Sequence, residues 1–174
     1  IAPEDLIALL VPPPAFADVR FDTYVPDPEH PSQAAAVAAG EAFAARPRAA
    51  GKRRLFRAPP PEARPGLYFD GGFGVGKTHL LASVWHAAQG SKVFGTFVEY
   101  TNMVGALGFA RAAQELAGYD LVCIDEFELD DPGDTVLMSS LMAGLADAGV
   151  RIAATSNTLP DRLGEGRFAA DDFL

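Results

Sequence analysis

The chain has 174 residues, a net charge of −9 and a hydrophobic content of 49%, which is typical of one soluble globular domain with a sizeable core. It contains no apolar run near the roughly eighteen residues that a membrane-spanning helix needs, and no charged and apolar leader opens it, so we expect a cytoplasmic protein. The single cysteine, Cys123, excludes an internal disulfide and a cysteine-based zinc cluster, and the three histidines form no metal-ligand pattern, so we expect no metal cluster.

The first part of the chain predicts two helices joined by an irregular connection. PEDLIALLV (3–11) predicts a short helix that the following prolines end, because proline cannot continue a helix. FDTYVPDPEHP (21–31) contains three prolines and predicts an ordered but irregular connection. From Ser32, a good N-cap, SQAAAVAAGEAFAAR (32–46) consists of strong helix formers. We divide the chain into an N-terminal arm, residues 1–19, and a core domain, residues 20–174.

A basic, proline-rich stretch follows this second helix. Residues 46–64, RPRAAGKRRLFRAPPPEAR, carry seven of the fourteen Lys and Arg residues and one acid, a local charge of +6 that leaves −15 for the remaining chain. Phosphate contacts need a positive surface, so an acidic domain binds nucleic acid poorly and we do not expect nucleic acid as a partner. The stretch alone could contact an acidic partner, nucleic acid or a membrane, which would bring the protein near a membrane surface. The interpretation we favour is a solvated loop.

Beyond this stretch, short apolar runs alternate with helical stripes. The runs are GLYF (66–69), KVFGTFVEY (92–100), YDLVCI (119–124) and VRIAAT (150–155). Between them lie apolar stripes at helical spacing: Leu80, Leu81, Val84, Trp85 and Ala88; Val104, Leu107, Ala110 and Leu116; and Val136, Leu137, Leu141 and Leu145. Such a pattern predicts an α/β fold in three layers, with a parallel sheet covered by helices on both faces.

The first of these runs leads into a glycine-rich loop. Residues 71–78 match G-x-x-x-x-G-K-[ST], with an apolar strand before the loop and a helical pattern that opens at Lys77. Glycines let successive backbone N–H groups turn inward around anionic oxygens, and the helix N-terminus adds partial positive charge. Lys77 can then reach the β- and γ-phosphates of a nucleotide, and the Thr78 hydroxyl can bind Mg²⁺. The residues that we expect to bind the nucleotide are Gly71, Gly72, Phe73, Gly74, Val75, Gly76, Lys77, Thr78 and His79.

Two further apolar runs end in polar residues. YDLVCI is followed by Asp125 and Glu126, and the last run ends in Thr155, Ser156 and Asn157. In an open parallel sheet, ligands bind beyond the carboxyl ends of the strands, so these residues and the glycine loop should face one crevice. Asp125 would hold magnesium through a water molecule, and Glu126 would polarise the attacking water as a general base. Asn157 could sense the γ-phosphate or cap a turn, and the residues alone leave both open.

Taken together, GLYFDGGFGVGKTHLL, DLVCIDEFELDDPGDTVLMSSLMAGLADAGVRIAATSN and LPDRLGEGRF resemble the ZapE family of AAA+ ATPases, bacterial cell-division proteins related to mitochondrial AFG-type ATPases. The resemblance covers most of residues 20–174. It implies a P-loop NTPase fold of the AAA+ class, with a fifth strand, a helical lid and a second sensor that should follow residue 174. It also implies ATP and Mg²⁺ as cofactors.

The same resemblance assigns roles to single residues. Lys77 and Thr78 become the Walker A pair, Asp125 and Glu126 the Walker B acids, and Asn157 the first sensor. Arg167 is the nearest match to an arginine finger that serves a neighbouring subunit, with Arg162 second, and Phe21–Tyr24 should lie near the adenine. The implied function is ATP-driven conformational work in a homo-oligomeric ring, hexameric when full length, at the division septum on the protein FtsZ.

Three other functions use the same loop. A helicase loader or transposition helper of the DnaC or IstB kind would act on nucleic acid through the basic stretch, although the −15 elsewhere in the chain disfavours it. A small-molecule kinase would need an arginine-bearing lid, and Arg111 is the only arginine between the loop and Asp125. A scaffold that binds ATP without hydrolysing it is disfavoured by Glu126.

Overall fold

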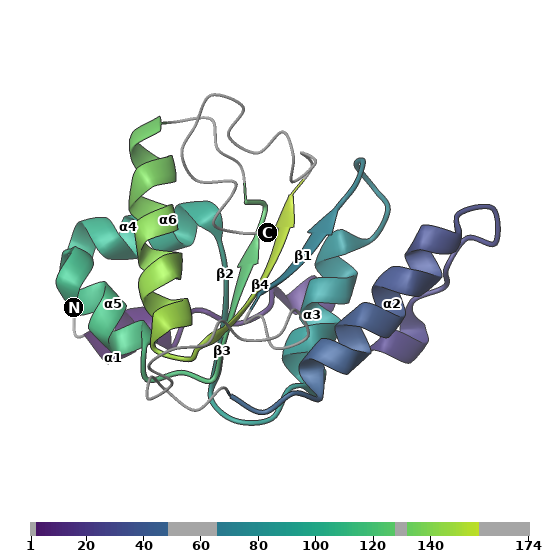
Figure 1. The fold of residues 1–174 in the computed structure, drawn as a ribbon, viewed down its shortest axis with the longest axis horizontal. Helices are drawn as coiled ribbons and strands as arrows, with labels where there is room; N and C mark the ends of the chain where they lie inside the picture. The colour runs from purple at the N-terminus through teal and green to yellow at the C-terminus, as the bar shows by residue number, and fades with distance from the viewer. Residues whose placement is uncertain (1–2, 49–65, 128–131, 157–174) are drawn as a thin grey trace, which may run out of the picture.

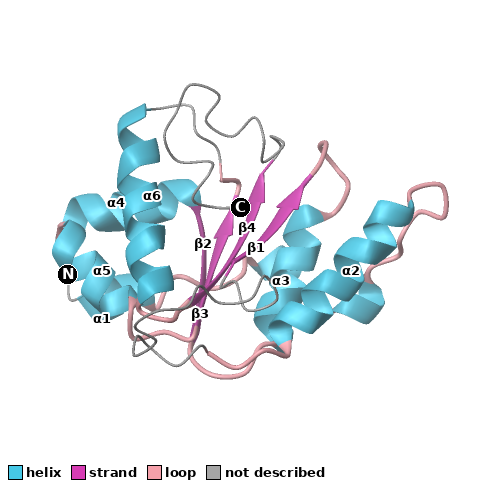
Figure 2. Cartoon of the chain, in the orientation of Figure 1, coloured by secondary structure: helices cyan, strands magenta, loops and turns pink. Residues whose placement is uncertain are grey.

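The computed structural model describes residues 3–48, 66–127 and 132–156, which form helices around one sheet. Helices cover both faces of the strands (Figure 2). The elements in chain order are α1 (Pro3–Ile7), η1 (Pro14–Phe16), η2 (Phe21–Thr23), α2 (Pro31–Ala44), β1 (Gly66–Asp70), α3 (Lys77–Ala87), β2 (Lys92–Thr96), α4 (Phe97–Leu107), α5 (Phe109–Leu116), β3 (Leu121–Asp125), α6 (Pro132–Asp147) and β4 (Arg151–Ser156). No helix among these described elements is long and apolar enough to cross a membrane.

The four strands are parallel and lie in the order β1-β4-β3-β2. The central strands β3 and β4 are buried along their whole length. Figure 1 shows α2 and α3 on one side of the sheet and α4, α5 and α6 on the other. Each side has its own apolar cluster, with Phe94 and Cys123 in the α2–α3 layer and Met138 and Leu141 in the α6 layer. The predicted parallel sheet with two helical layers is therefore confirmed.

The N-terminal segment packs onto the sheet rather than away from it. Ile7 and Leu10 are buried in the cluster that contains α4, α5 and α6. The carbonyl of Leu10 accepts a hydrogen bond from the N–H of Phe94 in β2, at 2.9 Å. This contact covers part of an edge strand that would otherwise present unpaired backbone groups. The division of the chain at residue 20 stays a prediction.

Two predicted boundaries are wrong. The run 92–100 is not one strand, because β2 ends at Thr96 and α4 begins at Phe97. The Thr96 side chain accepts the N–H of Glu99 at 3.2 Å, and the Glu99 carboxylate accepts the N–H of Thr96 at 2.7 Å, which is a reciprocal capping box. Ser32 is also not the cap of α2, since this helix begins at Pro31, a residue that suits a first helical position.

The stripe from Val104 to Leu116 belongs to two helices. Gly108, with φ of +80°, separates α4 from α5, and this left-handed conformation is one that glycine adopts without strain. The stripe from Val136 to Leu145 lies in α6, so the helix that its spacing predicts is confirmed. Trp85, which the helical stripe of α3 contains, is only partly buried beside the core.

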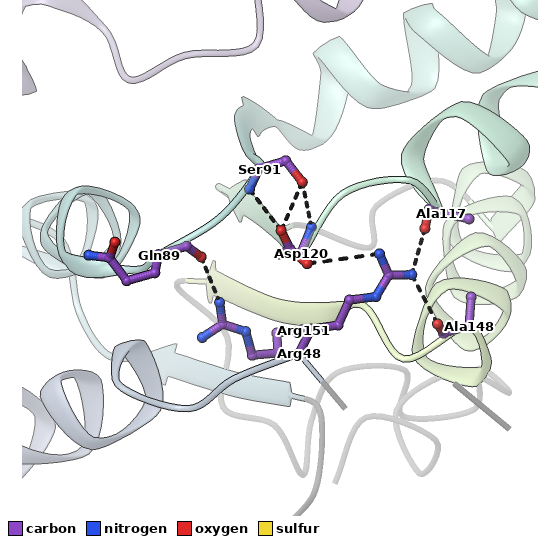
Figure 3. Close-up of polar contacts among 7 residues, drawn as sticks. All are labelled: Arg48, Gln89, Ser91, Ala117, Asp120, Ala148 and Arg151. Atoms are coloured by element: carbon purple, nitrogen blue, oxygen red, sulfur yellow. Dashed lines mark hydrogen bonds and ion pairs between the residues drawn. The ribbon is translucent and has the colours of Figure 1, made fainter. Parts of the chain in front are cut away.

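At the end of the sheet where the strands begin, Arg48 and Arg151 donate hydrogen bonds to carbonyls at the carboxyl ends of α2, α3, α5 and α6. Figure 3 shows the bonds at the ends of α3, α5 and α6. Arg48 donates to the carbonyls of Ala117, after α5, and Ala148, after α6, at 2.8 and 3.1 Å. Arg151 donates to carbonyls at the ends of α2 and α3. Asp120 lies between the two cations, 3.9 Å from Arg48, and its carboxylate accepts the N–H and hydroxyl of Ser91 at 2.8 and 3.0 Å. Cations at helix C-termini offset the partial negative charge there.

Candidate functional site

The glycine-rich loop joins β1 to α3 at the carboxyl end of the sheet, as the motif predicts. Gly76 is the residue before α3 and has φ of +87°. A Cβ at this position would lie 2.6 Å from the Tyr24 ring, so both the backbone conformation and the space require glycine. The loop therefore passes closely beneath an aromatic side chain from another part of the chain.

Lys77, the first residue of α3, folds its side chain back over the start of the loop. Its Nζ donates to the carbonyls of Gly71 and Gly72, at 2.8 and 2.6 Å. Burial lowers the pKa of Lys77, and the nearby carboxylates of Asp125 and Asp70 act in the opposite direction. The ammonium group thus lies within the curve of the loop, where phosphate oxygens would contact it.

Thr78 faces the end of β3. Its hydroxyl donates to the Asp125 carboxylate, at 3.1 Å from Oδ1 and 3.0 Å from Oδ2, across 47 residues of sequence. Asp125 is buried at 6% exposure. A hydroxyl beside a carboxylate supplies hard oxygen ligands of the kind that Mg²⁺ prefers, with remaining positions left to water and phosphate. The two residues predicted to hold magnesium are therefore brought together and fit that ion. Among the described residues there is no group of three or more His, Cys, Asp or Glu that could hold a metal.

Glu126 follows Asp125 in a backbone conformation that is rare for a non-glycine residue, with φ of +54°. Such a residue costs of the order of 1–3 kcal/mol and persists only where surrounding contacts fix it. The contacts come from Thr155 in β4: its Oγ1 accepts the N–H of Glu126 at 3.0 Å, and its carbonyl accepts the N–H of Phe127 at 2.7 Å. Strain of this kind clusters at functional sites.

These residues surround one cavity of about 300 Å³ at the carboxyl end of the sheet. Its lining comes from the loop, α3, β3, β4 and the N-terminal segment, and consists of Phe16, Phe73, Gly74, Gly76, Lys77, Thr78, His79, Asp125, Glu126, Thr155 and Ser156. The size is at the lower end of the range for small-molecule sites. The loop and both acids therefore share one crevice, as the strand topology predicts.

The connection between η1 and α2 also contacts the glycine loop. The sequence pattern did not predict these contacts. The Tyr24 hydroxyl donates to the carbonyl of Val75 at 2.7 Å, and Nε2 of His79 lies 3.0 Å from both Thr23 Oγ1 and the Arg20 carbonyl. The rings of Tyr24 and His79 meet edge to face, 5.5 Å apart. This connection, residues 20–24, therefore holds the glycine loop from outside.

A second cavity, of about 500 Å³, lies on the other side of the loop. It is lined by residues of α2, β1 and the glycine loop, with Tyr24, His30 and Gln33 among its polar side chains. Three predicted residues, Asn157, Arg162 and Arg167, lie outside the described residues, as does the basic stretch from residue 49 onward.

Comparison with known proteins identifies the family. The sequence profile described as AFG1-like ATPase matches residues 2–174. The chain belongs to the AFG1-like ATPase family. It is 34% identical over 109 residues to the cell division protein ZapE of Escherichia coli, both of strain K12 and of O157:H7. The aligned part is 56% of this chain and 29% of each relative, so the chain spans under a third of these relatives. The resemblance drawn from the motifs is confirmed.

Solved structures confirm the fold class. DnaA from Aquifex aeolicus, solved with AMPPCP, superposes with a TM-score of 0.66 at 15% identity, over 94% of this chain and 48% of that one. Domain III of Thermotoga maritima DnaA gives a TM-score of 0.64 at 20% identity, over 90% and 64%. DnaI gives a TM-score of 0.57 at 17% identity, over 87% and 78%. The chain therefore has the AAA+ P-loop fold predicted from its sequence.

Proposed function

We propose that this AFG1-like domain binds ATP with Mg²⁺ and hydrolyses it. The observation that carries the proposal is the contact of Thr78 with Asp125, which joins the glycine loop to the acids after β3 in one cavity. A chance glycine-rich turn has no reason to meet a buried carboxylate of a distant strand end. Membership of an ATPase family supports the same reaction.

Each residue has a distinct role in this reaction. Loop N–H groups and Lys77 bind the β- and γ-phosphates, and the N-terminus of α3 adds partial positive charge. Thr78 and Asp125 would hold Mg²⁺, which would neutralise part of the phosphate charge. Glu126 takes a proton from the attacking water, and Asn157 orients that water or contacts the γ-phosphate. Arg167 of a neighbouring subunit would stabilise charge in the transition state, an effect of about 10³ to 10⁵ in rate in comparable sites.

For the full-length protein we propose ATP-driven conformational work in a homo-oligomeric, hexameric ring. The relatives of known name are cell division proteins, which supports a client in the division machinery, such as FtsZ, and a cytoplasmic location near the membrane. Phe21–Tyr24 would lie near the adenine, since this connection already borders the phosphate loop through Tyr24.

Removing the lysine tests the nucleotide site. In the full-length protein, Lys77→Ala should weaken Mg-ATP binding by about tenfold or more, because it removes a charged donor to the phosphates. Lys92→Ala is the matched control, since Lys92 bonds the carbonyls of His86 and Ala88 away from the cavity. Isothermal titration calorimetry measures both affinities. An unchanged affinity of the Lys77 variant would contradict the assignment.

The basic stretch supports one alternative, a helper ATPase that acts on nucleic acid. Residues 46–64 carry a charge of +6 in an otherwise acidic chain. Under this alternative the full-length protein binds single-stranded DNA with an affinity that falls steeply with salt, and neutralising the cations between residues 52 and 57 abolishes the binding. Under the proposal that we favour, binding stays weak and these cations make little difference to it.

A further inference from the structure

We propose that Thr155 is the positioning residue of the hydrolytic site, and that its hydroxyl orients both acids at the end of β3. The proposal rests on the ATPase function proposed above. It differs from the roles already assigned, because Thr155 would act through Asp125 and Glu126 rather than on the nucleotide.

The backbone pairing between β3 and β4 changes at the site. The two strands stay in regular register up to the pair of Ile124 with Ala154. One residue further, the acceptor for the N–H of Glu126 is the side-chain hydroxyl of Thr155, at 3.0 Å, in place of a backbone carbonyl of β4. The same hydroxyl donates to Oδ1 of Asp125 at 2.5 Å. Thr155 is buried, with 1% of its surface exposed, so water does not compete freely for these bonds.

Thr155 also explains how Glu126 keeps its unusual conformation. The peptide groups on the two sides of the Glu126 Cα both bond to Thr155, one to its hydroxyl and the next, through the N–H of Phe127 at 2.7 Å, to its carbonyl. Fixing both flanking peptides fixes φ and ψ of the residue between them. The direction in which the Glu126 side chain leaves the backbone therefore depends on Thr155.

The hydroxyl is a required part of this arrangement. One hydroxyl can donate once and accept at the same time, and here it donates to Asp125 and accepts from Glu126. Asp125 in turn accepts the hydroxyl of Thr78, so the chain of bonds runs from β4 to the glycine loop. Valine has nearly the same shape as threonine and can neither donate nor accept. Serine can do both.

Three variants of the full-length protein test this role. Thr155→Val should lower kcat about tenfold or more and raise the Mg²⁺ concentration for half-maximal rate, while the Kd for ATP stays within about threefold, because the groups that bind the phosphates remain. Thr155→Ser should restore kcat to within about threefold of the wild type. Ser139→Ala, which removes a hydroxyl that bonds the Thr135 carbonyl within α6, is the control and should leave kcat unchanged.

The outcomes separate this inference from the function on which it rests. Absence of ATP turnover in the wild type would overturn both. Normal turnover in the wild type and in Thr155→Val would overturn the positioning role alone, as would a Thr155→Ser variant as slow as Thr155→Val. Thermal unfolding of each variant, with Thr155→Ala as a second hydroxyl-free variant, shows whether the fold survives. If both hydroxyl-free variants fail to fold, the hydroxyl serves the fold and the proposal is overturned.

Discussion

Replacing Arg151 by methionine tests how the base of the sheet is held together. Arg151 begins β4 with only 4% of its surface exposed. Its guanidinium donates to the carbonyls of Phe43 and Ala44, both at 3.3 Å, and of Gln89 at 3.4 Å, the last of which Figure 3 shows. Burial lowers the pKa of Arg151, and the neighbouring Asp120 counteracts this shift. An arginine side chain is charged at neutral pH, so a cation is buried here.

The expected cost follows from two opposing terms. Well-formed hydrogen bonds to a charged group contribute about 1.5–3 kcal/mol each, and these three are long, so about 1 kcal/mol each is a reasonable value. Removing the buried charge also removes its desolvation penalty, which offsets part of the loss. The carbonyls at the ends of α2 and α3 lose their donor, however, and remain buried. We expect Arg151→Met to lower the free energy of unfolding by about 2–3 kcal/mol, and Tm by about 4–12 °C.

Arg111→Met is the matched control for this substitution. Arg111 forms an exposed ion pair with Glu115 on α5, at 2.7 Å, and such pairs contribute about 0.3–0.5 kcal/mol. Urea unfolding followed by circular dichroism gives the free energy of both variants. If Arg151→Met costs no more than Arg111→Met, or stabilises the protein, the desolvation penalty outweighs the bonds and the reasoning is wrong.

Two further substitutions address the base of the sheet and the glycine loop. Hydrogen bonds from the N–H and hydroxyl of Ser91 hold the pKa of Asp120 below its usual range, so its contribution to stability is complete above about pH 4 and is lost as the pH falls through the lower folded-state pKa. Between about pH 5 and pH 2.5, the Tm of the Asp120→Asn variant should therefore fall by less than the Tm of the wild type, as measured by calorimetry. Equal falls in Tm would contradict the claim that the Asp120 carboxylate stabilises the fold. Tyr24→Phe keeps the ring over the loop but removes the bond to the Val75 carbonyl, so ATP affinity should weaken about 2- to 12-fold. An affinity equal to that of the wild type in calorimetry would show that the loop does not need this contact.

Much of the fold could be predicted because apolar runs and helical stripes are local signals. The four strands and α6 follow from these signals directly. The error at residues 97–100 arose because Phe97 and Val98 continue an apolar run, although the sequence T-F-V-E contains the Ser/Thr-x-x-Glu spacing of a capping box. That spacing was the signal that could have placed the start of α4.

The site could be predicted only in part, for a related reason. The glycine motif is continuous in sequence, and the acids follow an apolar run, so both can be found without a structure. The contacts of Tyr24 with Val75 and of Thr155 with Asp125 join residues 51 and 30 positions apart. Their partners depend on strand register and on the path of the N-terminal segment, which no local pattern contains.

The arginines that bind helix ends are a further feature that the sequence does not reveal. Arg48 lies in the basic stretch that the sequence predicts to be a solvated loop, but its guanidinium donates hydrogen bonds to carbonyls at two helix ends. Which of the fourteen cations binds a helix end depends on where the helices end in space. For residues 49–64, which lie outside the described residues, the solvated loop stays a prediction.

Hydrolysis of Mg-ATP by the full-length protein and by its Glu126→Gln variant tests the central claim most directly. The amide keeps the shape of the side chain but cannot accept a proton from water, so nucleotide affinity should be preserved while turnover falls by about 10² to 10⁴. Phosphate release under steady-state conditions, with ATP affinity from calorimetry, measures both quantities. A wild type that hydrolyses ATP and a variant that binds it equally well but is nearly inactive would support the account. Undiminished turnover in the variant would contradict it.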